Sequence, residues 1–247
     1  MNRKGGRYVA LADQAHPRHH QDEYLHASVL GMKSRRARTR NSRALRRKLA
    51  PAAHAYGDCC AQLLKHPTTE NFAAFQVVGY HTTLLLDTLM NAAIPRSDGE
   101  LSMYLRRHLM EEKHHEEPGG MTVEDLTELG VDPRNTKAPQ QILDLEELLL
   151  DWIDNKHPVA VLGFLQLEHY HPTLEGIELM MMKTKLPRTV FRNLELHAHL
   201  DVGHSTELDY QIDHLPLERW HRKLIYQSAV VSIKAVRSSL LDIFKEK

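Results

Sequence analysis

The sequence has few cysteines and aromatic residues and lacks any long apolar segment. Its 247 residues include 2 cysteines, 2 tryptophans and 5 phenylalanines. Because Cys59 and Cys60 are adjacent, they cannot form the disulfide framework of a small secreted protein, and a reducing cytoplasmic setting is expected. No apolar run reaches the roughly 18 residues of a membrane span, and no signal-peptide core is evident. We therefore expect a soluble, ordered protein with one large folded domain and no membrane partner.

Charge is distributed unevenly, although 32 Lys and Arg residues balance 32 Asp and Glu residues. Residues 1–48 contain 13 basic and 3 acidic residues, so the remainder of the chain carries a net charge of −10. Basic residues are densest in Lys33–Lys48, where no aromatic residue is interleaved for stacking on bases. We interpret residues 1–42 as a basic, histidine-rich arm and residues 43–247 as the folded domain, and we do not expect nucleic acid as a partner.

Helical periodicity recurs from residue 43 onward, and strand-like alternation is scarce. This pattern predicts a single all-α domain with a buried centre. Gly130 directly after Leu129 predicts the end of a helix, and Pro172 inside a helical pattern predicts a kink or a break. The expected helices span residues 43–66, 70–93, 98–117, 122–129, 139–155, 158–183, 188–211 and 217–244.

One histidine motif stands out among the 18 histidines of the chain. With about 100° of rotation per helical residue, His197, Asp201 and His204 form one stripe, and His199 faces the opposite side. Leu194 and Leu208 extend the stripe, so an otherwise apolar face is interrupted by two imidazoles and a carboxylate. If buried, these groups need partners, and such a set suits divalent iron or manganese. The alternative is a surface helix whose His and Asp side chains bond to solvent.

A second candidate segment contains Glu112 and His115, which lie three residues apart and share a helix face. Glu-x-x-His is the ligand spacing of helical di-iron sites. Because the segment is rich in Glu and His, an exposed, charged helix end is the alternative explanation. Glu111, four residues before His115, is the alternative ligand.

A third candidate, Glu168, follows a run that is apolar on nearly every side, which predicts a deeply buried helix. A carboxylate at the end of such a run needs a cation, unless the helix emerges into solvent at that point. Glu168 and His171 form another Glu-x-x-His pair, and Glu175 is the alternative to Glu168.

Together the three segments offer three carboxylates and three imidazoles on three separate helices. Such a set can hold two metal ions and leave positions open for dioxygen. The six candidate metal ligands are Glu112, His115, Glu168, His197, Asp201 and His204.

The order of these motifs resembles the haem oxygenase-like di-iron oxidases over about residues 70–215. In that family, a Glu and a His on one helix precede a Glu on a later helix and then a His-x-x-x-Asp-x-x-His motif, which His197, Asp201 and His204 match fully. The resemblance implies a seven-helix haem oxygenase-like bundle with two Fe ions, for which Mn is the alternative, and O2 as co-substrate. It implies oxidation of a small substrate of fatty-acid or amino-acid type by decarboxylation, desaturation, C–C cleavage or N-oxygenation. An external electron donor and a homodimer are compatible with this assignment.

Two alternatives use other residues. A ferritin-like di-iron protein would use the pairs Glu112–His115 and Glu168–His171, and would leave the His-x-x-x-Asp-x-x-His stripe unused. A metal-free haem oxygenase-like protein would be a cofactor-free oxidase or a thiaminase-type enzyme with a cysteine nucleophile, for which Cys59–Cys60 is the only source.

Overall fold

The computed structural model describes residues 41–116, 120–170 and 172–244, without the side chains of residues 113–116 and Glu168. Thr39–Lys247 forms one compact unit, and its described residues contain helices and no strand. The α-helices are α2 (Asn41–Lys65), α3 (Thr69–Ala93), α4 (Gly99–Glu116), α5 (Met121–Glu128), α6 (Gln140–Asn155), α7 (Val161–Phe164), α8 (Leu174–Thr184), α9 (Arg192–His214) and α10 (Arg219–Asp242). Short 3-10 helices are η1 (Ile94–Arg96), η2 (Pro133–Asn135), η3 (Pro158–Ala160), η4 (Leu165–Tyr170) and η5 (Arg188–Val190).

The all-α prediction is confirmed for the described residues, but the expected count of seven helices is wrong, because nine α-helices are present there. The single helix expected over residues 158–183 is also wrong. Its first part consists of η3, the one-turn α7 and η4, and α8 begins only after Pro172. Proline lacks the amide hydrogen that a continuing helix requires, so the chain breaks there. The arm expected over residues 1–42 lies outside the described residues, except for the first two residues of α2, and stays a prediction.

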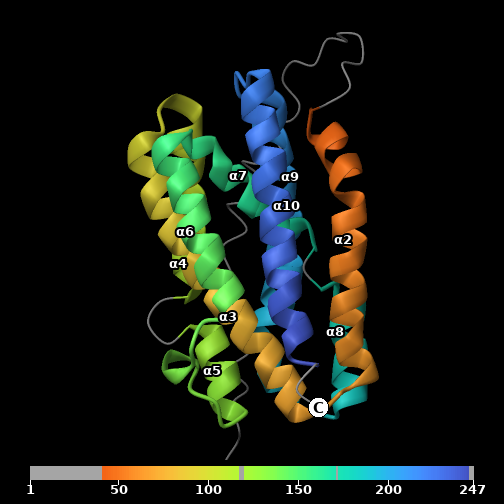
Figure 1. The fold of residues 1–247 in the computed structure, drawn as a ribbon. Helices are drawn as coiled ribbons and strands as arrows, with labels where there is room; N and C mark the ends of the chain where they lie inside the picture. The colour runs from red at the N-terminus through yellow and green to blue at the C-terminus, as the bar shows by residue number, and fades with distance from the viewer. Residues whose placement is uncertain (1–40, 117–119, 171, 245–247) are drawn as a thin grey trace, which may run out of the picture. The chain divides into compact units, whose positions relative to one another are not determined.

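Helix α10 is the centre of the bundle. In Figure 1 it runs down the front, with α2 on one side and α6 and α7 on the other, and it contacts all three. Its buried face carries small residues, including Ser228 and Ala229, which allow close approach. Gly163 of α7 packs directly against these residues. A Cβ at this position would lie 2.4 Å from Ile225 O and 2.5 Å from Ser228 Cβ. The chain can cross α10 this closely only without a side chain at residue 163.

Helix α5 ends where the sequence predicts. Gly130 has a φ of +79°, a left-handed conformation that glycine adopts readily. Its N–H donates to Thr127 O at 2.9 Å, and the N–H of Val131 donates to Leu126 O at 2.9 Å. These two bonds satisfy carbonyl groups that the last turn of α5 would otherwise leave free.

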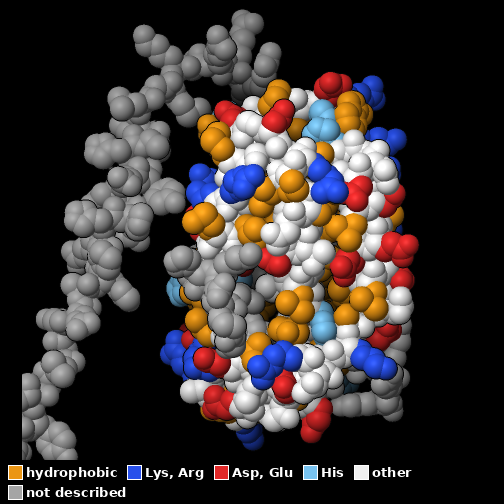
Figure 2. Space-filling model, turned by 90° about the vertical axis from the view of Figure 1, so that its left-hand side faces the viewer, with side chains coloured by type: hydrophobic (Ala, Val, Ile, Leu, Met, Phe, Trp, Pro, Cys, Tyr) orange, Lys and Arg blue, Asp and Glu red, His pale blue; other side chains and the backbone are white. Residues whose placement is uncertain are grey.

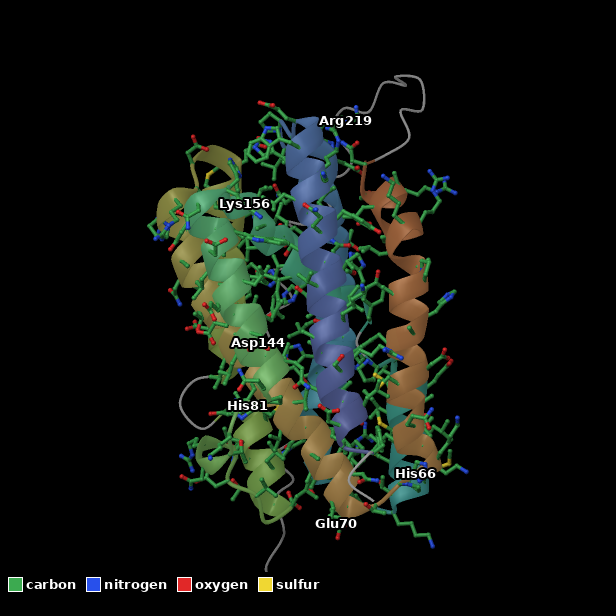
Figure 3. The ribbon with its side chains drawn as sticks, in the orientation of Figure 1. His66, Glu70, His81, Asp144, Lys156 and Arg219 are labelled. Atoms are coloured by element: carbon green, nitrogen blue, oxygen red, sulfur yellow. The ribbon has the colours of Figure 1, made fainter. Side chains whose placement is uncertain are left out.

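Side chains fill the space between the helices, as Figure 3 shows. His81, labelled there on α3, joins that helix to the loop before α6, because its Nε2 lies 2.9 Å from Thr136 Oγ1. On the outer face drawn in Figure 2, hydrophobic, basic and acidic side chains are interspersed. None of the described helices is both long and apolar enough to cross a membrane.

Candidate metal centre

The buried face of α9 carries the whole His-x-x-x-Asp-x-x-His motif. His197, Asp201 and His204 are only 8%, 6% and 6% exposed, whereas His199 and Val202 between them are exposed. This alternation matches the stripe expected from helical rotation. His197 Nδ1 lies 3.5 Å from Asp201 Oδ1, and His204 Nδ1 lies 3.8 Å from the same oxygen. Asp201 therefore lies between the two imidazoles.

Helix α4 brings two glutamates to His204. Glu112 is buried, and its Oε1 lies 3.3 Å from His204 Nδ1. Glu111 is more exposed, and its Oε2 lies 3.4 Å from His204 Nε2. The two alternative ligands of the sequence thus approach opposite nitrogens of one imidazole. The sequence indicated that Glu111 and Glu112 are alternatives, but only the packing of α4 on α9 shows which nitrogen each one faces.

His108 also belongs to this cluster, although it is not among the sequence-based candidates. It is fully buried, its ring centroid lies 4.6 Å from that of His204, and its Nε2 lies 3.8 Å from Glu112 Oε1. Three side chains each offer a ligand atom, and these atoms lie within 4.8 Å of one another: those of His108, Glu111 and His204. This spacing is close enough for the three to hold one metal ion. The signal in the sequence is its position four residues before Glu112, which places both residues on one helix face.

The remaining sequence candidates are not brought into the cluster by any described contact. The side chains of His115 and Glu168 lie outside the described residues, although their backbones belong to α4 and η4, and His171 lies outside them entirely. Their roles as ligands stay predictions. Glu175 is exposed in the first turn of α8, so it is not enclosed with the groups of α4 and α9.

The donor set fits divalent iron or manganese. Two ligand atoms that each lie about 2.1 Å from one ion are roughly 3.0–3.4 Å apart. The 3.3 Å between Glu112 Oε1 and His204 Nδ1 falls in this range, and the 3.5 and 3.8 Å from Asp201 Oδ1 to the two imidazoles are slightly longer. Mixed imidazole and carboxylate ligation is the kind that non-haem iron uses for reactions with O2.

A small cavity reaches this cluster from the side of α3. It has a volume of about 50 Å³, and Glu112, His197 and Asp201 line one side of it. Side chains of α3 and of the α7–η4 segment line the rest: Thr82, Thr83, Leu86, Phe164, Leu165 and Leu167. The candidate ligands are therefore accessible to a small molecule, although they are buried.

Asp125 of α5 anchors the beginning of α9. It is fully buried; its Oδ1 accepts a hydrogen bond from Arg192 Nε at 2.9 Å, and its Oδ2 accepts one from the Asn193 N–H at 2.9 Å. Burial raises the pKa of Asp125, and the bonds from Asn193 and Arg192 oppose that rise. A carboxylate at this place satisfies a free backbone N–H and interacts favourably with the helix dipole. It holds the end of α9 from which His197 follows within about one turn.

The fold can be compared with those of known proteins. No protein-family model and no curated protein matches the sequence. A crystal structure of a domain of unknown function with a heme oxygenase-like fold, from Shewanella denitrificans OS217, aligns with a TM-score of 0.70. The alignment covers 82% of this chain and 91% of that chain, at 17% sequence identity. This chain has a haem oxygenase-like fold.

Within the haem oxygenase-like fold, the cysteine pair is not arranged as a nucleophile. Burial raises the pKa of Cys59, and it raises the pKa of Cys60 to about 12, against a smaller opposing effect of the hydrogen bond from Tyr56. A nucleophilic cysteine needs a lowered pKa, because the thiolate is the reactive form. Both thiols therefore stay protonated at neutral pH, which disfavours the thiaminase-type alternative.

Proposed function

We propose that this chain is an O2-dependent non-haem di-iron oxidase or oxygenase that acts on a small organic substrate. The observation that carries the proposal is the convergence of Glu112 from α4 on the buried face of α9 formed by His197, Asp201 and His204. The two segments are more than 80 residues apart in the sequence, and each has the residue spacing of a metal-binding motif. The haem oxygenase-like fold supports the proposal, because it is the fold that the motif order implies.

Glu112, His197, Asp201 and His204 would hold the two iron ions, with His115 and Glu168 completing the set. When bound, iron would supply the activation of O2 and the change of oxidation state that a substrate oxidation needs. The protein keeps bulk water away from these groups, because all four are less than a tenth exposed. Manganese is the alternative metal. The proposal also includes an external electron donor and a homodimeric assembly.

Iron analysis of matched variants tests this proposal. After anaerobic loading with Fe²⁺, we expect about two iron ions per chain in the wild type, as in helical di-iron proteins. His199→Ala is the control, because His199 is exposed on the opposite side of the same helix. It should bind iron like the wild type, whereas His197→Ala and Glu112→Gln should bind less than half as much. Fewer than about one iron per wild-type chain, or full iron binding by His197→Ala, would contradict the proposal.

The ferritin-like alternative makes a different prediction for two histidines. It needs His171 and leaves His204 unused, whereas the proposed site needs His204. His204→Ala and His171→Ala are therefore compared in the same iron-loading assay. Loss of iron only in His171→Ala would favour the ferritin-like alternative, and loss only in His204→Ala would support the proposed site.

A further inference from the structure

A second cavity adjoins the one beside the candidate ligands. It has a volume of about 100 Å³ and lies among α2, α3, α9 and α10. Four residues line both cavities, namely Thr82, Thr83, Leu167 and His197, so the two spaces are adjacent. A cavity of about 150 Å³ is known to hold one benzene molecule, so a ligand that occupies both spaces would be about the size of one aromatic ring with a small substituent.

The walls of both cavities lack positive charge. No Lys or Arg lines either one within the described part of the chain. The larger cavity is lined mainly by apolar side chains, including Phe75, Val78, Val236 and Leu240, and its polar residues are uncharged apart from the titratable His197. The smaller cavity adds the carboxylates of Glu112 and Asp201. A substrate carboxylate would find no cationic side chain there.

Two of the shared residues, Thr82 and Thr83, present hydrogen-bond acceptors to the cavities, and His197 is the third polar residue that lines both. The hydroxyl of Thr82 donates to Val78 O at 2.8 Å, and that of Thr83 donates to Gly79 O at 3.3 Å. A hydroxyl group has one donor hydrogen and two acceptor lone pairs. Because both hydrogens are used within α3, the two threonine oxygens offer only lone pairs to a ligand. They therefore match a ligand that carries an N–H or O–H group.

We propose that these adjacent cavities are the substrate site and that they take a small, mainly apolar amine or alcohol. The oxidation of this ligand rests on the proposed di-iron function, whereas its binding in the cavities does not. The apolar walls would bury the body of the molecule, and Thr82 and Thr83 would accept its N–H or O–H hydrogen. A carboxylic acid fits less well, because no Lys or Arg of the described residues lines either cavity to pair with its carboxylate.

Four probes of nearly equal size test the class of ligand: toluene, benzyl alcohol, benzylamine and benzoate. Their dissociation constants are measured by ligand-observed NMR on the full chain, both metal-free and loaded anaerobically with Fe²⁺. Because a hydrogen bond adds modestly to affinity, benzyl alcohol or benzylamine should bind about two- to tenfold more tightly than toluene. The better of the two identifies the class as alcohol or amine. In the metal-free chain, benzoate as the tightest ligand, or equal affinity for all four probes, would overturn the inference.

Substitutions in α3 locate the binding. Thr82→Val and Thr83→Val each remove an acceptor with little change of shape, and each should reduce the preference for benzyl alcohol or benzylamine over toluene. Thr88→Val is the matched control, because its hydroxyl makes the same kind of bond, to Leu84 O at 3.1 Å, but lines neither cavity. A preference that survives in Thr82→Val and Thr83→Val, or falls equally in Thr88→Val, would place the ligand elsewhere.

A blocking variant separates this inference from the proposed function. Gly79 is an exposed residue in the lining of the larger cavity, and nothing lies within 4 Å of where its Cβ would be. Gly79→Phe should therefore fold, and its ring, placed over the cavity, should abolish binding of the probes. Gly57→Phe is the control, because Gly57 is equally open but lines neither cavity. Full iron binding without probe binding would overturn the substrate class alone. Probe binding that Gly79→Phe abolishes, in a chain that binds no iron, would support the cavity and overturn the di-iron function.

Discussion

At the scale of single residues, the partial burial of Cys60 raises the pKa of its thiol and makes the stability of the protein depend on pH. Burial raises the pKa of this thiol from an ordinary value of 9.0 to about 12. The folded chain therefore holds the Cys60 proton more tightly than the unfolded chain does between pH 9 and 12. The contribution of the protonated thiol to stability is complete below pH 9 and decreases as the pH rises through that interval.

We predict that the wild type loses stability more steeply than Cys60→Ala as the pH rises from 9 toward 12. The measurement is urea unfolding of both proteins at several pH values, with the difference in unfolding free energy plotted against pH. Below pH 9 the difference should be constant. Parallel curves for the two proteins above pH 9 would mean that the thiol is not held protonated by its surroundings.

Single residues also show how far the sequence predicts the candidate site. His197, Asp201 and His204 lie on one helix, so rotation along the chain was enough to place them on one face. The sequence alone does not place His108 in the site, because its closeness to His204 depends on how α4 packs against α9. A regular helix fixes distances within itself, whereas the distance between two helices depends on all the side chains that separate them.

At the scale of elements, Gly163 is the residue on which the α7–α10 contact depends. Its missing Cβ would lie 2.4 Å from the backbone oxygen of Ile225, which cannot move aside as a flexible side chain could. We expect Gly163→Ala to destabilise the protein by about 1–3 kcal/mol or more, as overpacked cores do. Gly57→Ala is the control, because its Cβ would meet nothing within 4 Å. That change should be neutral or stabilising, since alanine favours helix.

Denaturant unfolding of both alanine variants measures the two effects. Equal stability of Gly163→Ala and the wild type would show that α7 does not approach α10 as closely as described. The experiment also bears on the candidate site, because the segment that contains α7 continues into η4, where Leu165 and Leu167 line the cavity beside the candidate ligands.

The same segment shows where the sequence misleads at this scale. The apolar run before Glu168 predicts burial, and Val159–Leu167 is indeed buried throughout. The pattern could not distinguish a long helix from short α and 3-10 turns, because a segment that is apolar on every side has no periodicity to reveal its pitch. Pro172 predicts a kink or a break in the helix, and the structure has a break, so that α8 is a separate helix.

At the scale of the whole molecule, Thr39–Lys247 is a compact unit by itself. We predict that a chain beginning at Thr39 folds with the same helix content and the same iron stoichiometry as the full chain. Its unfolding free energy should change by less than about 0.5 kcal/mol, as for changes outside the packed core. Circular dichroism, iron analysis and urea unfolding of the two chains provide the comparison. A shortened chain that fails to fold would show that residues before Thr39 contribute to the unit.

Helix α10 has a consequence for how this protein is made. It is the last helix of the described residues, yet it is the one against which α2, α6 and α7 pack. During synthesis, those earlier helices emerge from the ribosome with their apolar faces uncovered, because the helix that covers them does not yet exist. The bundle can therefore close only after translation has passed Asp242, and until then the apolar faces that pack on α10 are uncovered in the nascent chain.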